Sequence, residues 1–350
     1  MKLGIDFWSL YLQGWNIFEF LDYAHRLQVD VMHVGVQTTD WHIFESLEPA
    51  YLQRVRARAD ELGVALETGG CAISPTSTAF AQQGTCITPP AECAEASMAI
   101  AIADVSQLLR IAHAVGSPLV RCYLGHGGDR HSALPLAAHI ESMLAVLEQV
   151  RPLALELGVK LAIENHGDLE ARELKAVIEQ AGPDIAGVCL DTGNPPFMGE
   201  CPFLTLEMLA PYVITTHVRD TALWAHPRGA VAQWVALGEG SVGIERWLER
   251  LQTLCPSVTV NIENLTGSPP RVVNYLEPDF WRDYPERPAV DFARFLALVR
   301  QGQPSMGAML LPPQGVELPP EYRPAMVAQQ RFDLERSICY CRETLGLGEK

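Results

Sequence analysis

Four side chains able to bind a metal ion stand at the ends of separate apolar runs in the second half of the chain. They are Glu164, Asp191, His217 and Glu263. Three carboxylates that meet in one place repel one another unless they are protonated or neutralised by a cation. Three oxygen donors and one imidazole nitrogen suit Mn²⁺, Mg²⁺, Co²⁺ or Zn²⁺. We therefore predict that these residues hold one divalent metal ion. The donor types do not select among the four ions, of which Mn²⁺ is the one we favour.

Two further side chains lie two positions beyond predicted ligands. Side chains two apart on a strand point to the same face, so His166 would accompany Glu164 and Arg219 would accompany His217. We predict that His166 is catalytic, as an acid or by polarising a substrate oxygen, and that Arg219 binds substrate. The simpler interpretations are a histidine bonded to a backbone carbonyl and an arginine paired with an acid such as Asp220 or Asp191.

Other polar residues near strand ends are candidates for lining the same pocket. We predict substrate contacts for Glu67, Arg121, His126 and Asn194. A single acid at a strand end is often a helix cap or a surface charge. Asp6, at the end of the first predicted strand, is therefore interpreted as a structural residue.

The elements that must position these residues alternate between short apolar strands and longer helical patterns. Parallel strands covered by helices on both faces are apolar along their length, as these runs are. Eight such units fit a closed (β/α)8 barrel, whose active site lies at the carboxyl ends of the strands. We therefore predict an α/β fold, a TIM barrel. The strands are predicted near 3–7, 30–36, 64–68, 118–124, 159–164, 186–191, 213–218 and 258–263.

The helices carry start and stop signals of their own. Asn16 with Glu19 three residues later is a capping-box pair. A doubly wound sheet is the alternative fold, but the first turn after strand one, SLYLQGWN, has no G-x-G-x-x-G phosphate loop. Four helical patterns end on glycine, which tolerates the left-handed conformation of a helix stop: Gly63, Gly116, Gly158 and Gly182. Helices are predicted from Asn16 and over about 48–62, 97–115, 135–157, 169–181, 203–212 and 242–254.

Three segments are longer than a minimal barrel requires. Residues 71–96 and 266–290 follow strands, on the side where barrel active sites are built, and we interpret them as a lid or pocket wall. Residues 303–322 are rich in Pro and Gly and precede a helix predicted over 324–345. We thus divide the chain into a barrel at 1–302 and a linker with a C-terminal helix at 303–350. That helix is expected to pack on the barrel or on another subunit of a homo-oligomer.

Charge and cysteine usage narrow the possible partners. The chain has 350 residues, with 26 Lys and Arg against 42 Asp and Glu and a formal net charge of -16. Nucleic acid and an anionic membrane are therefore not expected partners. The first residues lack a secretory signal pattern, and the longest apolar stretches fall far short of a membrane span. Nine cysteines that stand mostly singly are typical of reduced thiols, so we expect a cytoplasmic protein.

At IENHGD, LDTGNP, THVRD, LGEGSVG and NIEN the chain resembles the xylose-isomerase-like TIM-barrel superfamily. That superfamily includes sugar isomerases, ketose 3-epimerases, inosose dehydratases and the endonuclease IV enzymes of DNA repair. The resemblance covers about residues 1–300. It implies the ligand set named above: Glu164 on strand five, Asp191 on strand six, His217 on strand seven and Glu263 on strand eight.

Two departures separate the chain from the DNA-repair enzymes. The third residue after Asp191 is Asn194, where epimerases and endonuclease IV commonly carry histidine. The stretch before Gly238 reads Ala232-Gln233-Trp234, where endonuclease IV has an Asp-x-His. The ligands for a second and third zinc are thus missing, and DNA repair is not expected.

The resemblance implies an enzyme, and we predict a metal-dependent isomerase or epimerase of a sugar, keto-sugar or polyol. The metal would polarise a carbonyl and stabilise an enediolate, while Glu164 and Glu263 would move a proton on opposite faces. The alternative is a lyase of the same superfamily: a dehydratase, an oxo-sugar-acid decarboxylase, or an eliminase or deglycosidase acting on a 3-keto-sugar. A third hypothesis is that the chain alone is not catalytic, and is a metal-bound scaffold or a subunit that needs a partner chain for activity.

Overall fold

The eight predicted strands are all present. The computed structural model of the chain describes residues 1–36, 42–85, 87–93, 97–308, 310–311, 316 and 318–348. Most strand residues are buried, as expected of strands covered on both faces. The strands are β1 (Leu3–Asp6), β2 (Val31–Gly35), β3 (Ala65–Ala72), β4 (Leu119–Tyr123), β5 (Lys160–Glu164), β6 (Ala186–Asp191), β7 (Val213–His217) and β10 (Val260–Ile262).

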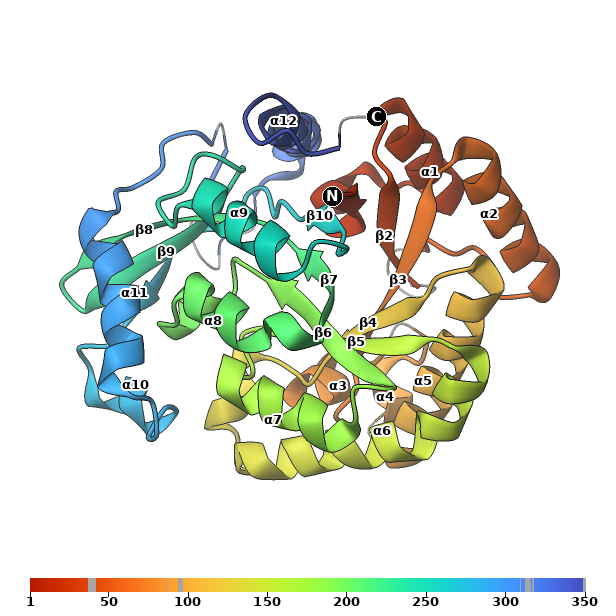
Figure 1. The fold of residues 1–350 in the computed structure, drawn as a ribbon, viewed down its shortest axis with the longest axis horizontal. Coiled ribbons are helices and arrows are strands. Elements are labelled where there is room, and N and C mark those ends of the chain that lie inside the picture. The colour runs from red at the N-terminus through yellow and green to blue at the C-terminus, as the bar shows by residue number, and fades with distance from the viewer. Residues whose placement is uncertain are drawn as a thin grey trace. The chain divides into compact units, whose positions relative to one another are not determined.

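These strands form one eight-stranded sheet in the order β10-β1-β2-β3-β4-β5-β6-β7 (Figure 1). The neighbours β1 and β10 pair in parallel, as do successive strands from β2 to β6. The two ends of this order meet, because Val218, directly after β7, pairs in parallel with Ile262 of β10. The closed parallel sheet confirms the predicted TIM barrel.

The helices begin and end close to the predicted residues. Asn16 caps the first helix by accepting from the backbone N–H groups of Phe18 and Glu19, and the Glu19 carboxylate accepts from Asn16 N in return. Gly63 and Gly158 take the predicted left-handed conformation, with φ of 64° and 65°. The predicted helices are α1 (Ile17–Arg26), α2 (Pro49–Leu62), α5 (Ser97–Val115), α6 (Leu136–Leu157), α7 (Ala171–Ala181), α8 (Pro202–Leu209) and α9 (Ile244–Leu254).

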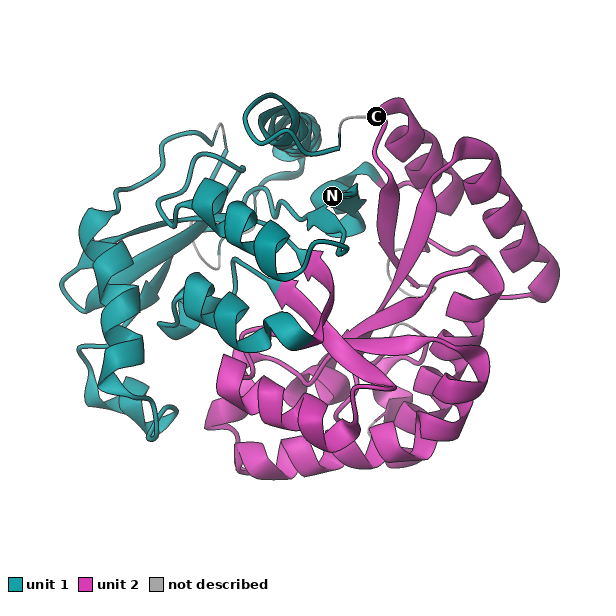
Figure 2. Ribbon diagram, viewed as in Figure 1, with its two compact units in different colours: residues 1–13, 191–211, 217–350 teal, residues 14–190, 212–216 magenta. Residues whose placement is uncertain are grey.

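The chain divides into two compact units (Figure 2). Unit 2 comprises residues 14–190 and 212–216, and unit 1 comprises residues 1–13, 191–211 and 217–350. In unit 2 the helices pack in chain order, α1 on α2, α2 on α5, α5 on α6 and α6 on α7. By length and composition α5 is apolar enough to cross a membrane, but it is packed between α2 and α6, and core helices commonly have that composition.

Unit 1 contains a second, antiparallel sheet that the sequence analysis did not predict. It consists of β8 (Asp220–His226), β9 (Gly229–Val235) and β11 (Arg271–Val273), in the order β11-β9-β8. The hairpin β8–β9 follows the seventh barrel strand directly, where a strand-helix alternation leads one to expect a helix. Gly229 begins β9 with φ of 147°, and a Cβ there would come within 2.2 Å of the Val273 carbonyl oxygen. Only glycine fits that turn.

The long segment after β10 folds onto this sheet. It contains β11 and the helix α10 (Pro278–Arg282), and α11 (Ala289–Gln301) follows. Phe280 and Tyr284 are buried in a hydrophobic cluster with Phe295 and residues of the hairpin. These two aromatic side chains of the predicted pocket wall therefore build a core of their own. The remaining short helices are α3 (Thr78–Gln83) and α4 (Pro90–Cys93), with 3-10 turns at Phe7–Gln13, Gly127–His131, Pro195–Met198, Ala210–Tyr212 and Pro320–Tyr322.

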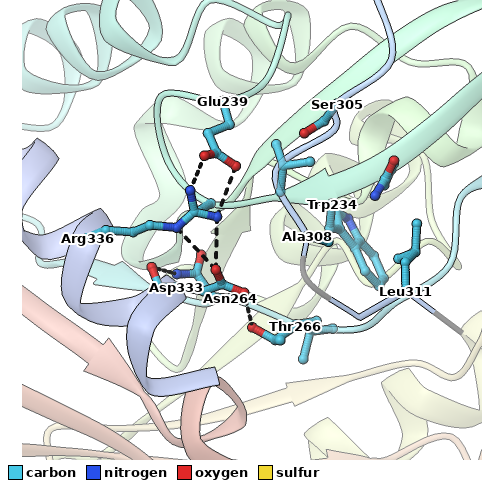
Figure 3. A pocket seen from close by; sticks show the side chains of 13 residues that line it. Trp234, Glu239, Asn264, Thr266, Ser305, Ala308, Leu311, Asp333 and Arg336 are labelled. Carbon is cyan, nitrogen blue, oxygen red and sulfur yellow. Dashed lines mark hydrogen bonds and ion pairs between the residues drawn. The ribbon is translucent and has the colours of Figure 1, made fainter. Parts of the chain in front are cut away.

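The C-terminal helix α12 (Arg323–Glu343) packs on unit 1 of its own chain. Asn264 Nδ2 donates to the Asp333 carbonyl at 3.0 Å and to Ser337 Oγ at 2.9 Å. Arg336 forms ion pairs with Glu239 and Asp333. These three residues line the small pocket shown in Figure 3. Of the two predicted packing modes, packing of the helix on its own chain is thus observed. The helix contacts Asn264, the residue next to Glu263.

Replacing Leu334 with Ala should destabilise the protein by about 2–5 kcal/mol, because a fully buried leucine leaves a cavity. Phe332→Ala, on the same helix but 58% exposed, should cost about 0.5 kcal/mol or less. Urea unfolding followed by circular dichroism would measure both changes. Equal costs at the two positions would show that α12 is not anchored through its buried face.

Candidate metal centre

Three of the four predicted ligands lie together in unit 1. Asp191 is the last residue of β6, His217 is the last residue of β7, and Glu263 follows β10. All three are buried, with relative exposures of 1%, 1% and 3%. Each offers one ligand atom within 4.8 Å of those of the others. The strand ends therefore bring two carboxylates and one imidazole to one place.

Backbone groups fix one oxygen of Asp191. Its Oδ1 accepts from Gly193 N at 2.6 Å and from Asn194 N at 2.9 Å. The tight turn after β6 thereby leaves Oδ2 for other partners. Asn194, a predicted substrate contact, thus lies beside this ligand through its backbone N–H, and a role for its side chain stays a prediction.

His217 lies between two acids. Its Nδ1 is 3.2 Å from Glu263 Oε2, and its Nε2 is 3.5 Å from Asp6 Oδ2. A carboxylate on the far nitrogen of a metal-binding histidine fixes the tautomer and the orientation of the ring. Asp6 is itself held, since its Oδ1 accepts from Trp8 N at 2.8 Å. The sequence analysis interpreted Asp6 only as structural, because its contact with His217 joins residues far apart in the chain.

Arg219 joins the two carboxylates of the cluster. Its Nε is 2.9 Å from Asp191 Oδ2, its Nη2 also contacts that oxygen, and Nη2 lies 2.9 Å from Glu263 Oε2. The guanidinium carbon lies 4.3 Å from the centre of the Trp234 ring. A Cβ on Gly193 would come within 2.8 Å of both side chains, so this close packing requires glycine there. Arg219 thus pairs with Asp191, one of the acids considered above, and not with Asp220.

The charges of this cluster fit a divalent cation. Asp6, Asp191 and Glu263 are three buried carboxylates, and Arg219 supplies one positive charge among them. With a neutral His217, two formal negative charges remain to be balanced. Carboxylate oxygens and an imidazole nitrogen are ligands for Mn²⁺ and related ions. The residues present therefore fit the predicted metal.

The predicted fourth ligand, Glu164, belongs to unit 2. It is fully buried at the end of β5 and forms an ion pair with Arg121. The Arg121 guanidinium lies over the ring of Tyr123, 4.6 Å from its centre. Arg121 is therefore positioned by Glu164 and Tyr123, and the membership of Glu164 in the ligand set stays a prediction.

The two predicted histidines of unit 2 surround the same tyrosine. The His166 ring stacks on Tyr123 at 4.1 Å between centres, and His126 stacks at 5.9 Å. His166 Nδ1 is 3.2 Å from the Gly125 carbonyl oxygen, which is the simpler arrangement considered above. Burial lowers the pKa of His166 to about 3 and lowers that of His126, so the His166 imidazole is neutral at pH 7. A neutral imidazole can polarise an oxygen, and its catalytic role stays a prediction.

Glu67 also lies in unit 2. Its carboxylate accepts a hydrogen bond from the Thr215 hydroxyl and lies 3.8 Å from His33. The structure thus gives Glu67 protein partners within the barrel, and its predicted substrate contact is not tested.

Asp220 anchors the loop between the hairpin and α9. Its carboxylate accepts from the backbone N–H groups of Thr221, Gly238 and Gly240 at 2.8, 3.1 and 3.0 Å. Burial raises the pKa of Asp220 to about 6, although these hydrogen bonds oppose the shift. Asp220 therefore holds this loop through its backbone hydrogen bonds.

The fold and the buried acid cluster together define a TIM barrel with a candidate metal centre at its strand ends. Residues 21–275 match the family described as "Xylose isomerase-like TIM barrel". The chain belongs to this family, which confirms the resemblance read from its motifs.

Similar proteins include both epimerases and a decarboxylase. The 3-oxo-isoapionate decarboxylase of Pectobacterium atrosepticum is 24% identical over 186 residues, which are 53% of this chain and 55% of that protein. The chain thus spans about half the length of this curated relative. A D-psicose 3-epimerase structure aligns over 99% of this chain and 100% of its own, with a TM-score of 0.59 and 15% identity. The IOLI protein with a bound zinc atom aligns over 85% and 96%, with a TM-score of 0.58 and 16% identity.

Asp220→Asn should make the stability of the protein less dependent on pH between 4 and 6. The native carboxyl has a pKa of about 6 against an ordinary 3.8, so in this window the native state binds more protons than the unfolded state. Its contribution to the free energy of unfolding, up to about 3 kcal/mol, is full below pH 3.8 and lost as the pH rises through 6.

Urea unfolding at several pH values would measure this effect. Asp168, whose pKa burial also raises to about 6, remains in the variant, so the dependence should fall by about half. The exposed control Asp60→Asn should leave the pH dependence as in the wild type. An unchanged dependence in Asp220→Asn would mean that this carboxyl titrates normally.

Proposed function

We propose that the protein is a divalent-metal-dependent isomerase or epimerase of a sugar, keto-sugar or polyol. The observation that carries this proposal is the buried cluster of Asp191, His217 and Glu263 at the strand ends. Family membership supports it, since similar solved structures include ketose 3-epimerases. We propose Mn²⁺ as the ion, a small sugar or keto-sugar as the substrate, and a homo-oligomer in the cytoplasm as the working form.

In this proposal Asp191, His217 and Glu263 hold the ion, with Glu164 as the fourth ligand. The bound ion supplies Lewis-acid polarisation of a substrate carbonyl, which acidifies the neighbouring C–H. Glu263 would remove that proton and later release it to solvent, and Glu164 would deliver to the opposite face a proton that it has taken up from solvent. His217 and Arg219 lie 3.2 and 2.9 Å from Glu263 Oε2 and hold the carboxylate in place.

A lyase is the second candidate, and one finding favours it specifically. The decarboxylase of P. atrosepticum is a curated relative with a stated reaction, although this chain matches only 55% of its length. Decarboxylation of an oxo acid and isomerisation of a keto-sugar both start from a polarised carbonyl and an enolate. The two reactions differ in the mass of the product, so mass spectrometry separates them directly.

The metal site can be tested by binding alone. The purified protein should bind about one Mn²⁺ per chain, and Asp191→Ala or His217→Ala should weaken binding by at least about 10–100-fold, the loss seen even for residues that only support ligands. Isothermal titration calorimetry of the metal-free protein measures both quantities.

The matched control is Asp60→Asn, an exposed carboxylate on α2 in unit 2. It should bind Mn²⁺ as the wild type does. Retention of full affinity by both Asp191→Ala and His217→Ala would remove these residues from the ligand set.

Glu263→Gln separates the base from the ligand. Glutamine keeps the shape and an oxygen donor but accepts no proton, so metal affinity should fall modestly. Turnover should fall further, by about 10²–10⁴-fold, as is usual when a general base is lost. In heavy water the wild type should place deuterium on the carbon next to the substrate carbonyl, which mass spectrometry of the recovered sugar detects.

Two outcomes would contradict this mechanism. Conversion without solvent deuterium and without a change in mass would indicate hydride transfer instead of proton transfer. Turnover by Glu263→Gln at the wild-type rate would show that another group is the base.

A further inference from the structure

A second arginine stands one aromatic ring away from the carboxylate cluster. Arg271 lies in β11, and its guanidinium carbon is 4.8 Å from the centre of the Trp234 ring and 4.2 Å from that of Phe197. The guanidinium carbon of Arg219 lies 4.3 Å from the centre of the same Trp234 ring. Two guanidinium groups are therefore gathered around one indole, and one of them also touches Asp191 and Glu263.

The two arginines differ in how their charges are balanced. Arg219 is paired with two carboxylates, whereas Arg271 forms no ion pair with any acid among the residues that the structure describes. Partial burial of the guanidinium lowers the pKa of Arg271, and the nearby charge of Arg219 lowers it further. The charge of Arg271 is therefore opposed by its surroundings, and an anion beside it would be stabilised.

Regular structure holds Arg271 in place. Arg271 is paired with Ala232 of β9 in the antiparallel sheet. Ala232 lies two residues before Trp234 on β9. Trp234 is fixed in turn, since its Nε1 donates to the Gly193 carbonyl at 2.8 Å. The residue Arg271 as a whole is exposed, although its guanidinium is partly buried. Stacking on two rings engages the face of the guanidinium and leaves the N–H groups at its edge to bind oxygens.

We propose that Arg271 binds an anionic group of the substrate, a carboxylate or a phosphate ester, while the opposite end of the substrate lies at the carboxylate cluster. Planar guanidinium groups bind such oxygens through two parallel hydrogen bonds. The net charge of -16 repels anions from the protein as a whole, so a preference for an anion has to arise locally. The proposal rests on the proposed function in one respect, that the substrate is a small sugar derivative.

Three ketoses that differ only at carbon six test this proposal: D-fructose, D-fructuronate and D-fructose 6-phosphate. Calorimetric titration at constant ionic strength, with and without Mn²⁺, should show at least one of the two anions binding about 10–100-fold more tightly than D-fructose, as charge-assisted hydrogen bonds to arginine predict. The tighter of the two anions identifies the group as carboxylate or phosphate.

Two substitutions at Arg271 and one control variant test whether Arg271 causes the preference for an anionic ketose. Arg271→Gln should abolish it with little change for D-fructose, and Arg271→Lys, which keeps the charge without the planar fork, should retain part of it. Arg282→Gln, at an exposed arginine on α10, should keep the wild-type preference.

Two results would overturn the proposal. One is that neither anion binds to the wild type more tightly than D-fructose, and the other is that Arg271→Gln keeps the full preference. A wild type that prefers the anion but binds no Mn²⁺ would instead contradict the metal-dependent function and leave the role of Arg271 standing.

Discussion

The burial of like charges at the strand ends is the constraint on which the site in unit 1 depends. Asp6, Asp191 and Glu263 are almost inaccessible to solvent, and carboxylates that lose water need positive charge or hydrogen-bond donors in its place. Arg219 supplies one such charge and His217 separates two of the acids. The same low exposure that makes this cluster costly also strengthens its attraction for a divalent cation.

The surrounding elements hold the neighbours of each ligand. Asn264, next to Glu263, is hydrogen-bonded by α12, and Asp220, close to His217, holds the loop at Gly238 and Gly240. The hairpin strand β9 supplies Trp234, over which Arg219 lies. An added hairpin and an added C-terminal helix thus position residues of the barrel's own centre. Both additions hold residues next to the predicted ligands in place, and such supporting contacts orient metal-binding side chains.

The elements that the sequence predicted correctly are those that apolar periodicity and capping residues determine. The eight strands, and the proximity of Asp191, His217 and Glu263 at their ends, follow from apolar runs that stop at a polar residue. The start of the first helix follows from the capping pair Asn16 and Glu19. The hairpin β8–β9 was missed because a strand-helix alternation gives no reason to expect two strands in succession. The contacts of Asp6 with His217 and of Arg271 with Trp234 were missed because they join residues far apart in the chain. No local pattern encodes such contacts.

The most direct test of a metal centre at these carboxylates is anomalous diffraction from crystals of the full chain grown with Mn²⁺. We predict a peak within bonding distance of Asp191, His217 and Glu263, at a position where the ion adds to the neutralising charge of Arg219. The contrary result is the absence of a peak there at saturating Mn²⁺, with the Arg219 guanidinium still joining Asp191 to Glu263. The cluster would then be a structural ion-pair network, and the metal-dependent mechanism would be wrong.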